Sequence, residues 1–162
     1  MPPDVPSLPV PVVRPARPED LEAVYLLGYD VWGEGAPLGD YLAQCRASAK
    51  YASGRWTVVA VRSAVAGAVI VYREGFGLPA GTWGAGSLCV DPAVRRLGLA
   101  KALMRSVLER EPGTAFLWAD VLPDFYRSLG FAPLPETCQT RPGSLLMARG
   151  SHDAGALRIT YF

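Results

Sequence analysis

The chain has 162 residues, of which 50% are hydrophobic and 19% are charged, and its formal net charge is +1. This length and composition indicate one folded domain with a sizeable core and exclude a largely disordered chain. The balanced charge excludes a general electrostatic attraction to nucleic acid or membrane, so any basic site must be local.

Cysteine and histidine usage narrows the chemistry further. Cys45, Cys89 and Cys138 are far apart and form no C-x-x-C pair, which argues against a disulfide framework or a zinc site. His152 is the only histidine, so neither a histidine-based triad nor a multi-histidine metal site is expected. We therefore expect a cytoplasmic protein without a metal.

The N-terminal stretch, residues 1–9, is rich in proline and lacks the basic and apolar regions of a signal peptide. It is predicted to be an extended arm before a single domain of residues 10–162. No apolar run approaches the ~20 residues of a membrane helix.

The first half of the domain predicts a strand, two helices and a hairpin. Residues 10–14 suit a strand, and apolar residues at helical spacing over 21–31 follow an acidic helix start. Residues 38–51 suit a second helix. Two apolar, β-branched runs, 56–62 and 65–73, predict a hairpin with a tight turn at Ser63 and Ala64.

The second half alternates strands and helices. A strand over 82–90 contains Gly84 and Gly86, which weaken it or mark a bulge. The elements predicted after it are a helix over 98–109, a strand over 114–118, a short helix over 123–129, an extended segment from Phe131, and strands over 144–148 and 156–161. Antiparallel strands followed by alternating elements indicate an α/β (α+β) fold, a mixed central sheet with about four helices covering both faces.

The stretch most informative about function is residues 90–101. A strand end stops at a proline, passes two arginines and a glycine, and becomes a helix whose first turn has no acidic side chain. The amides that open a helix have no partner within it and carry the positive end of its dipole. Gly98 has no Cβ and lets a ligand approach the backbone, so this stretch predicts a phosphate site. Asp91 is expected to cap the loop.

Two motifs resemble one family. Within residues 90–100, Arg95, Gly98 and Ala100 occupy the defined positions of the R/Q-x-x-G-x-G/A signature of the GCN5-related N-acetyltransferase (GNAT) superfamily. Residues 125–131, Phe-Tyr-Arg-Ser-Leu-Gly-Phe, resemble the F-Y-x-x-x-G-F segment of the same family. The resemblance covers residues 10–148 and implies the acyl-CoA N-acyltransferase fold.

The resemblance implies transfer of an acetyl group from acetyl-CoA to a primary amine by direct attack on the thioester. Backbone amides of residues 96–101 would hold the pyrophosphate, and the strand before them would pair with the pantetheine arm. The cofactor-binding residues expected on this basis are Leu88, Val90, Arg95, Arg96, Leu97, Gly98, Leu99, Ala100, Lys101 and Phe125.

The same resemblance makes Tyr126 the candidate general acid for the departing thiolate. A base or a held water must accept the amine proton. Family members often carry an acidic residue on the strand before the signature, but residues 82–90 contain none. Glu34, in the loop between the first helices, and Asp120, after the 114–118 strand, are the alternatives. Cys89 is expected to pack rather than react, since no histidine can activate it.

Other functions stay open at this point. The chain could be a CoA-binding regulatory or interaction domain with weak catalysis, or a transferase for another acyl group. The acceptor is a small-molecule or protein amine, and neither nucleic acid nor membrane is an expected partner. A homodimer is one assembly that the sequence allows.

Overall fold

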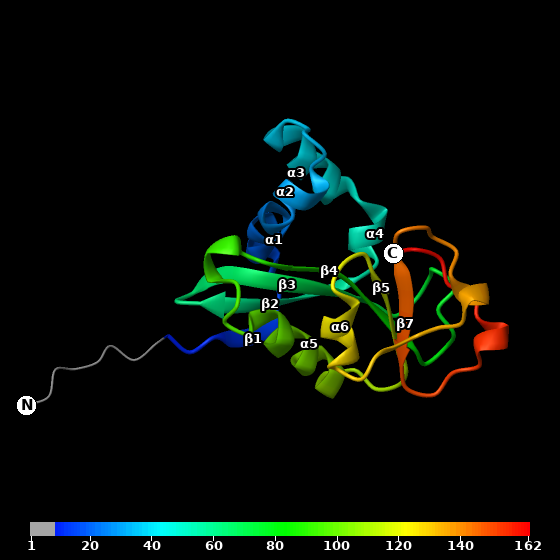
Figure 1. Ribbon diagram of the computed structural model, residues 1–162. Helices are drawn as coiled ribbons and strands as arrows, with labels where there is room; N and C mark the ends of the chain where they lie inside the picture. The colour runs from blue at the N-terminus through cyan, green and yellow to red at the C-terminus, as the bar shows by residue number, and fades with distance from the viewer. Residues whose placement is uncertain (1–8) are drawn as a thin grey trace, which may run out of the picture.

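The structure is a computed structural model that describes residues 9–162 (Figure 1). The predicted N-terminal arm therefore lies, except for its last residue, outside the described residues. Seven strands form one sheet in the order β1-β2-β3-β4-β5-β7-β6. The strands are β1 (Val12–Pro15), β2 (Arg55–Val61), β3 (Ala64–Tyr72), β4 (Trp83–Val90), β5 (Ala115–Ala119), β6 (Ala132–Pro133) and β7 (Leu145–Arg149). Among the strands of residues 9–162, only β4 and β5 pair in parallel, so the predicted mixed sheet is confirmed.

The helices cover both faces of this sheet, as predicted. They are α1 (Leu21–Leu27), α2 (Tyr29–Trp32), α3 (Leu38–Ala47), α4 (Ala49–Ala52), α5 (Leu99–Arg110) and α6 (Pro123–Arg127). Each of the two helices predicted in the first half is interrupted, the first at Gly28 and the second at Ser48. The extended Ser48 starts α4 afresh because its hydroxyl accepts the N–H of Tyr51. In residues 9–162 no helix is long and apolar enough to cross a bilayer.

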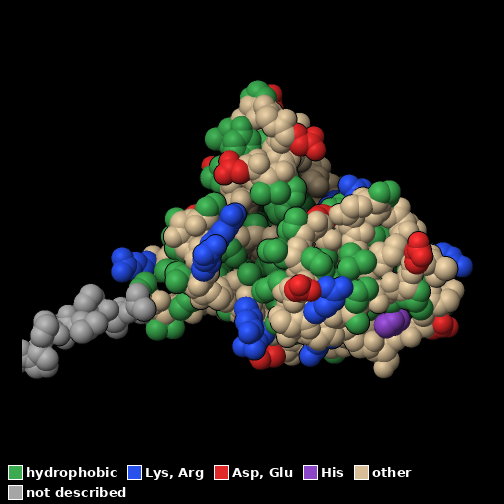
Figure 2. All heavy atoms as spheres, in the orientation of Figure 1, with side chains coloured by type: hydrophobic (Ala, Val, Ile, Leu, Met, Phe, Trp, Pro, Cys, Tyr) green, Lys and Arg blue, Asp and Glu red, His purple; other side chains and the backbone are tan. Residues whose placement is uncertain are grey.

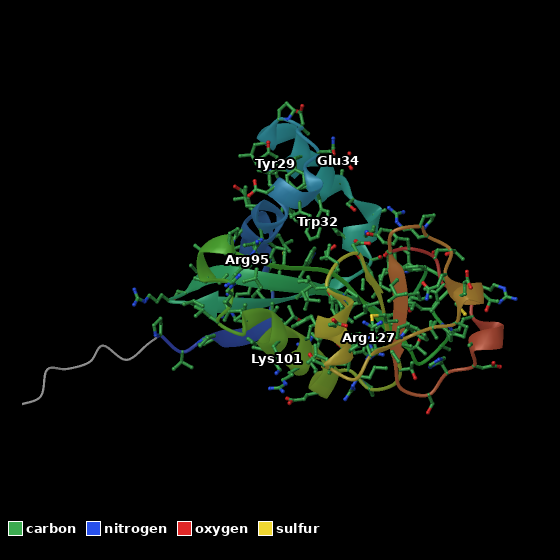
Figure 3. The ribbon with its side chains drawn as sticks, in the orientation of Figure 1. Tyr29, Trp32, Glu34, Arg95, Lys101 and Arg127 are labelled. Carbon is green, nitrogen blue, oxygen red and sulfur yellow. The ribbon has the colours of Figure 1, made fainter. Side chains whose placement is uncertain are left out.

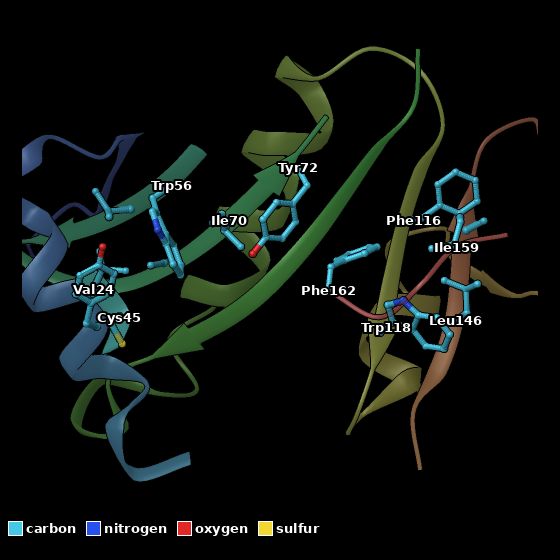
Figure 4. Close-up of a cluster of buried hydrophobic side chains, with 14 of the residues drawn as sticks. Val24, Cys45, Trp56, Ile70, Tyr72, Phe116, Trp118, Leu146, Ile159 and Phe162 are labelled. Carbon is cyan, nitrogen blue, oxygen red and sulfur yellow. The ribbon is translucent and has the colours of Figure 1, made fainter. Parts of the chain in front are cut away.

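The alternation of side chains along the strands separates two cores. On β3, Ala68, Ile70 and Tyr72 join the cluster beneath α1 and α3, whereas Val69 and Val71 join the cluster beneath α5. Figure 4 shows the first of these clusters. Because both faces are covered, the inner strands are apolar at almost every position.

The predicted hairpin is confirmed, but its turn lies one residue earlier than expected. Val61 pairs with Ala64, so Arg62 and Ser63 are the two loop residues. Both have positive φ angles, 52° and 65°, as a two-residue turn that matches the strand twist requires.

The strand predicted over residues 156–161 is wrong. A single 3-10 turn, Ala154–Ala156, precedes an irregular tail in which Leu157, Ile159 and Phe162 are nevertheless buried. The alternation of apolar residues that predicted a strand here reflects packing on the sheet face rather than strand pairing. The tail is joined to the rest of the protein by isolated hydrogen bonds rather than by a ladder. One of them runs from the Thr160 N–H to the Phe76 carbonyl at 2.8 Å.

Candidate active site

The site lies where β4 and β5 separate. These strands pair only at Trp83–Ala85, although β4 continues to Val90 along β3. Two residues, Ser87 and Leu88, oppose a single residue of β3, and Ser87 has a φ of 47°. Such a bulge increases the local twist and turns β4 away from its neighbour. The bulge predicted near Gly86 therefore forms, one residue beyond it, and it leaves one edge of β4 open.

Backbone groups of β4 face that open edge. The Asp91 N–H bonds the Ala66 carbonyl on the β3 side at 2.8 Å, so Val90 turns its own N–H and C=O toward β5. Leu88 shares this direction by alternation. The Arg95 Nε donates to the Val90 carbonyl at 3.2 Å, which places its guanidinium at the end of the open edge.

The loop after β4 presents a row of unpartnered amides. Asp91 caps it as predicted, since its carboxylate accepts the Ala93 N–H at 2.9 Å. Arg96 and Gly98 adopt left-handed conformations, with φ of 65° and 76°, and Gly98 leads directly into α5. Across the described chain, no amide of residues 96–101 donates to a protein group. These amides stand at the positive end of a 12-residue helix, which suits an anion.

The side chains of this loop divide into structural and exposed ones. Leu99 is buried in the core under α5, so only its amide is available to a ligand, whereas Leu97 is 69% exposed. Figure 3 shows Arg95 and Lys101 on the same side of the molecule, and Figure 2 shows basic side chains there beside apolar surface at the foot of the helical projection.

Tyr126 lies on α6, the short helix after β5. Its ring packs edge-on against Phe125 and Phe131, with centroids 5.1 and 6.3 Å away. Burial, followed by the negative charge of Asp120, raises the pKa of Tyr126 to about 12. The phenol is therefore protonated at neutral pH and can donate a proton.

Asp120 and Glu34 occupy different environments. Asp120 directly follows β5, accepts a hydrogen bond from the Tyr161 hydroxyl at 2.7 Å, and is near enough to influence Tyr126. Glu34 lies between α2 and α3 with a φ of 50°. Figure 3 shows it on the helical projection, well separated from Arg127 on α6. The structure thus brings Asp120, and not Glu34, to Tyr126.

Cys89 is part-buried on β4, and burial raises the pKa of its thiol to about 12. It is therefore unreactive at neutral pH, as its predicted packing role requires. Tyr161 is the site neighbour that the sequence did not suggest. It lies in the tail beyond the motifs, and 41 residues separate it from Asp120.

Comparison with known proteins identifies the family. Residues 52–133, from α4 through β6, match the family model for an acetyltransferase (GNAT) domain. The chain belongs to this GNAT family. The match includes β4, the loop after it, Asp120 and α6, whereas Glu34 and the tail lie outside it.

Solved structures share the GNAT fold at low sequence identity. A histone acetyltransferase HPA2 and related acetyltransferase from Corynebacterium glutamicum superposes with a TM-score of 0.67 at 19% identity, covering 88% of this chain and 97% of that one. A GNAT family acetyltransferase from Brucella melitensis in complex with acetyl-CoA gives 0.61 at 19% identity, covering 90% and 98%. N-acetylglutamate synthase from Neisseria gonorrhoeae, complexed with coenzyme A and N-acetyl-glutamate, gives 0.64 at 15% identity, covering 89% and 36%. Among curated protein sequences, none matches the chain.

Proposed function

We propose that this GNAT protein is an acetyl-CoA-dependent N-acetyltransferase that acts on a primary amine by direct attack on the thioester. The observation that carries the proposal is the row of unpartnered amides opening α5, placed beside the open edge of β4. A phosphate and an extended amide chain are the two ligands that these features suit. The Brucella melitensis neighbour in complex with acetyl-CoA supports the same ligand.

Two parts of the site would bind this substrate. The N–H groups of residues 96–101 donate hydrogen bonds to the pyrophosphate oxygens, and Arg95 and Arg96 add positive charge. The main-chain groups of Leu88 and Val90 pair with the amides of the pantetheine arm as a further strand would. The thioester then lies near the bulge, between Asp120 and Tyr126.

The chemistry assigns one role to each of these two side chains. A protonated amine cannot attack, so Asp120 accepts its proton, directly or through a water. The free amine then forms a C–N bond at the thioester carbon, and collapse of the intermediate breaks the C–S bond. The attacking nitrogen loses its second proton to solvent, while Tyr126 donates its own proton to the departing thiolate and recovers one from solvent.

Release of CoA thiol tests this function directly. Purified protein is incubated with acetyl-CoA and a panel of small amines, amino acids, aminoglycosides and lysine peptides, and free thiol is followed over time. We expect release that depends on one class of acceptor. Tight CoA binding without turnover of any acceptor would instead indicate a CoA-binding regulatory domain.

Replacing Gly98 with alanine tests the phosphate site. An added Cβ would meet no heavy atom within 4 Å, so the cost comes from the left-handed backbone alone, about 1 kcal/mol of stability. Altered amide directions should also weaken CoA binding, measured by calorimetry, by about tenfold. Gly39→Ala is the control, because Gly39 lies within α3, also has open space, and should gain stability. Unchanged CoA affinity in G98A would contradict the assignment.

Replacing Asp120 with asparagine tests the base. We expect turnover at neutral pH to fall by about 10²-fold. The deficit should shrink as the pH rises toward the pKa of the free acceptor amine, because a deprotonated amine needs no base. Asp124→Asn removes the same charge from an exposed side chain whose one ion-pair partner in the described part of the chain is Arg127, and it should leave turnover unchanged. A deficit in D120N that is constant with pH would remove Asp120 as the base.

A further inference from the structure

Three side chains from distant parts of the chain lie around Tyr161. The Arg141 guanidinium carbon lies 3.7 Å from the centroid of the Tyr161 ring, and the Lys50 Nζ lies 5.7 Å from it. The Tyr161 hydroxyl donates to Asp120. Lys50, Asp120, Arg141 and Tyr161 are called the Tyr161 cluster below. Figure 1 shows the end of the chain beside α4 and the ends of β5 and β7, which explains this meeting.

The cluster has a positive charge without a partner. Lys50 and Arg141 face a single carboxylate, Asp120, which already accepts a hydrogen bond. In residues 9–162, neither cation forms an ion pair. Lys50 is half-buried, and burial followed by the charge of Arg141 lowers its pKa. Arg141 is exposed, but its charge beside the half-buried Lys50 is unfavourable unless an anion offsets the two cations.

The cluster is also held in position, unlike a pair of free surface side chains. Trp118 packs against the Tyr161 ring with centroids 5.9 Å apart, and its Nε1 donates to the Thr160 carbonyl at 3.1 Å. Phe162, the next residue, is 4% exposed and anchors the tail. The ring on which the two cations rest is therefore fixed before any ligand arrives.

Asp120 connects this cluster to the proposed chemistry. It accepts the hydrogen bond of Tyr161, and its charge raises the pKa of both Tyr126 and Tyr161, so it lies near both phenols. Tyr126 belongs to the α5 side of the sheet, whereas Tyr161 packs on the opposite side. An acceptor would place its amine at Asp120, facing the thioester. The rest of the acceptor would then extend in the opposite direction, over Tyr161 toward Lys50 and Arg141.

We propose that the acceptor is a small amine that also carries a carboxylate, and that Lys50 and Arg141 bind this carboxylate. The proposal rests on the N-acetyltransferase function proposed above and names its substrate class. A guanidinium binds a carboxylate through two parallel hydrogen bonds, and an ammonium adds a second charge. The same positive charge disfavours polycationic acceptors such as polyamines.

Matched acceptors test the substrate class. Thiol release is measured with amino acids and ω-amino acids, each against its carboxamide, and with spermidine. We expect kcat/KM to be about tenfold or more higher for the acids than for their amides, with spermidine poorest. Equal rates for acids and amides, with turnover intact, would overturn this proposal and leave the N-acetyltransferase function standing.

Variants test the two residues. Lys50→Met and Arg141→Gln should each raise the KM for the acid about tenfold, with kcat and the KM for acetyl-CoA little changed. Arg158→Gln is the matched control, since within residues 9–162 the side chain of this tail arginine bonds only the Gly155 and Leu157 carbonyls. An unchanged KM for the acid in both cluster variants would also overturn the proposal.

A binding measurement separates this proposal from the enzymatic one. Glutarate, which has carboxylates but no amine, should raise the Tm of the CoA-bound protein, and Lys50→Met should abolish the rise. Glutarate binding without turnover of any acceptor would support the anion site and contradict the transferase function. If glutarate did not raise the Tm of the wild-type protein, the anion site would be contradicted, whether or not the protein turned over an acceptor.

Discussion

Replacing Tyr126 with phenylalanine is expected to lower kcat by about 10²-fold or more, while the dissociation constant of acetyl-CoA changes by less than about twofold. The ring fills the space between Phe125 and Phe131 in both proteins, so packing and substrate binding persist. Only the hydroxyl that we propose as the proton donor to the leaving thiolate is lost. Thiol release at saturating acetyl-CoA measures kcat, and calorimetric titration measures the dissociation constant.

Tyr25→Phe is the matched control for this variant. Tyr25 lies on α1 at the opposite side of the sheet, and its hydroxyl donates to no protein group within residues 9–162. Its loss should leave kcat unchanged. If Y126F retained the wild-type kcat, Tyr126 would not be the acid and its role would be packing alone.

The pH dependence of turnover follows from the direction in which the pKa of Tyr126 is shifted. The pKa of Tyr126 is raised from 10 to about 12, so the acid form that donates the proton persists to higher pH than in a free phenol. The decline in wild-type rate caused by loss of this proton should therefore be centred near pH 12 rather than near pH 10. A decline centred near pH 10 that is absent from Y126F would contradict the buried position of this hydroxyl.

Replacing Phe162 with alanine is expected to lower the free energy of unfolding by about 3 kcal/mol or more. The ring is 4% exposed and packs against Tyr72 and Phe76, with centroids 5.6 and 5.5 Å away. It also covers Gly84, where an added Cβ would lie 2.6 Å from it. Truncation therefore leaves a cavity on the sheet face and loosens the tail.

Urea unfolding measures this loss, and Val121→Ala is its control. Val121 is 70% exposed, so the same kind of truncation there should change stability by less than about 0.5 kcal/mol. F162A should also weaken binding of carboxylate acceptors more than binding of acetyl-CoA, because Tyr161 is the adjacent residue. A stability equal to that of V121A would show that the ring is not an essential part of the core.

Much of the fold could be predicted because its cause is local. The helix over 98–109 corresponds to α5, Leu99–Arg110, since a left-handed glycine, an apolar stripe and a terminal proline act within a few residues. The hairpin was predictable for the same reason, although the positive φ of Arg62 and Ser63 displaced its turn. The tail was not, because burial of Leu157 and Ile159 produces the same alternation as strand pairing.

By itself, the sequence determined the family, the order of the strands up to β7 and the loop that opens α5, because motifs and periodicity act over neighbouring residues. Only the tertiary structure placed Asp120 beside Tyr126 and Tyr161, and left Glu34 on the helical projection. It alone also brought Lys50 and Arg141 to the same ring. These contacts form only when β5, α4 and the tail pack together. The residues involved are far apart in the sequence, so no local pattern predicts the contacts.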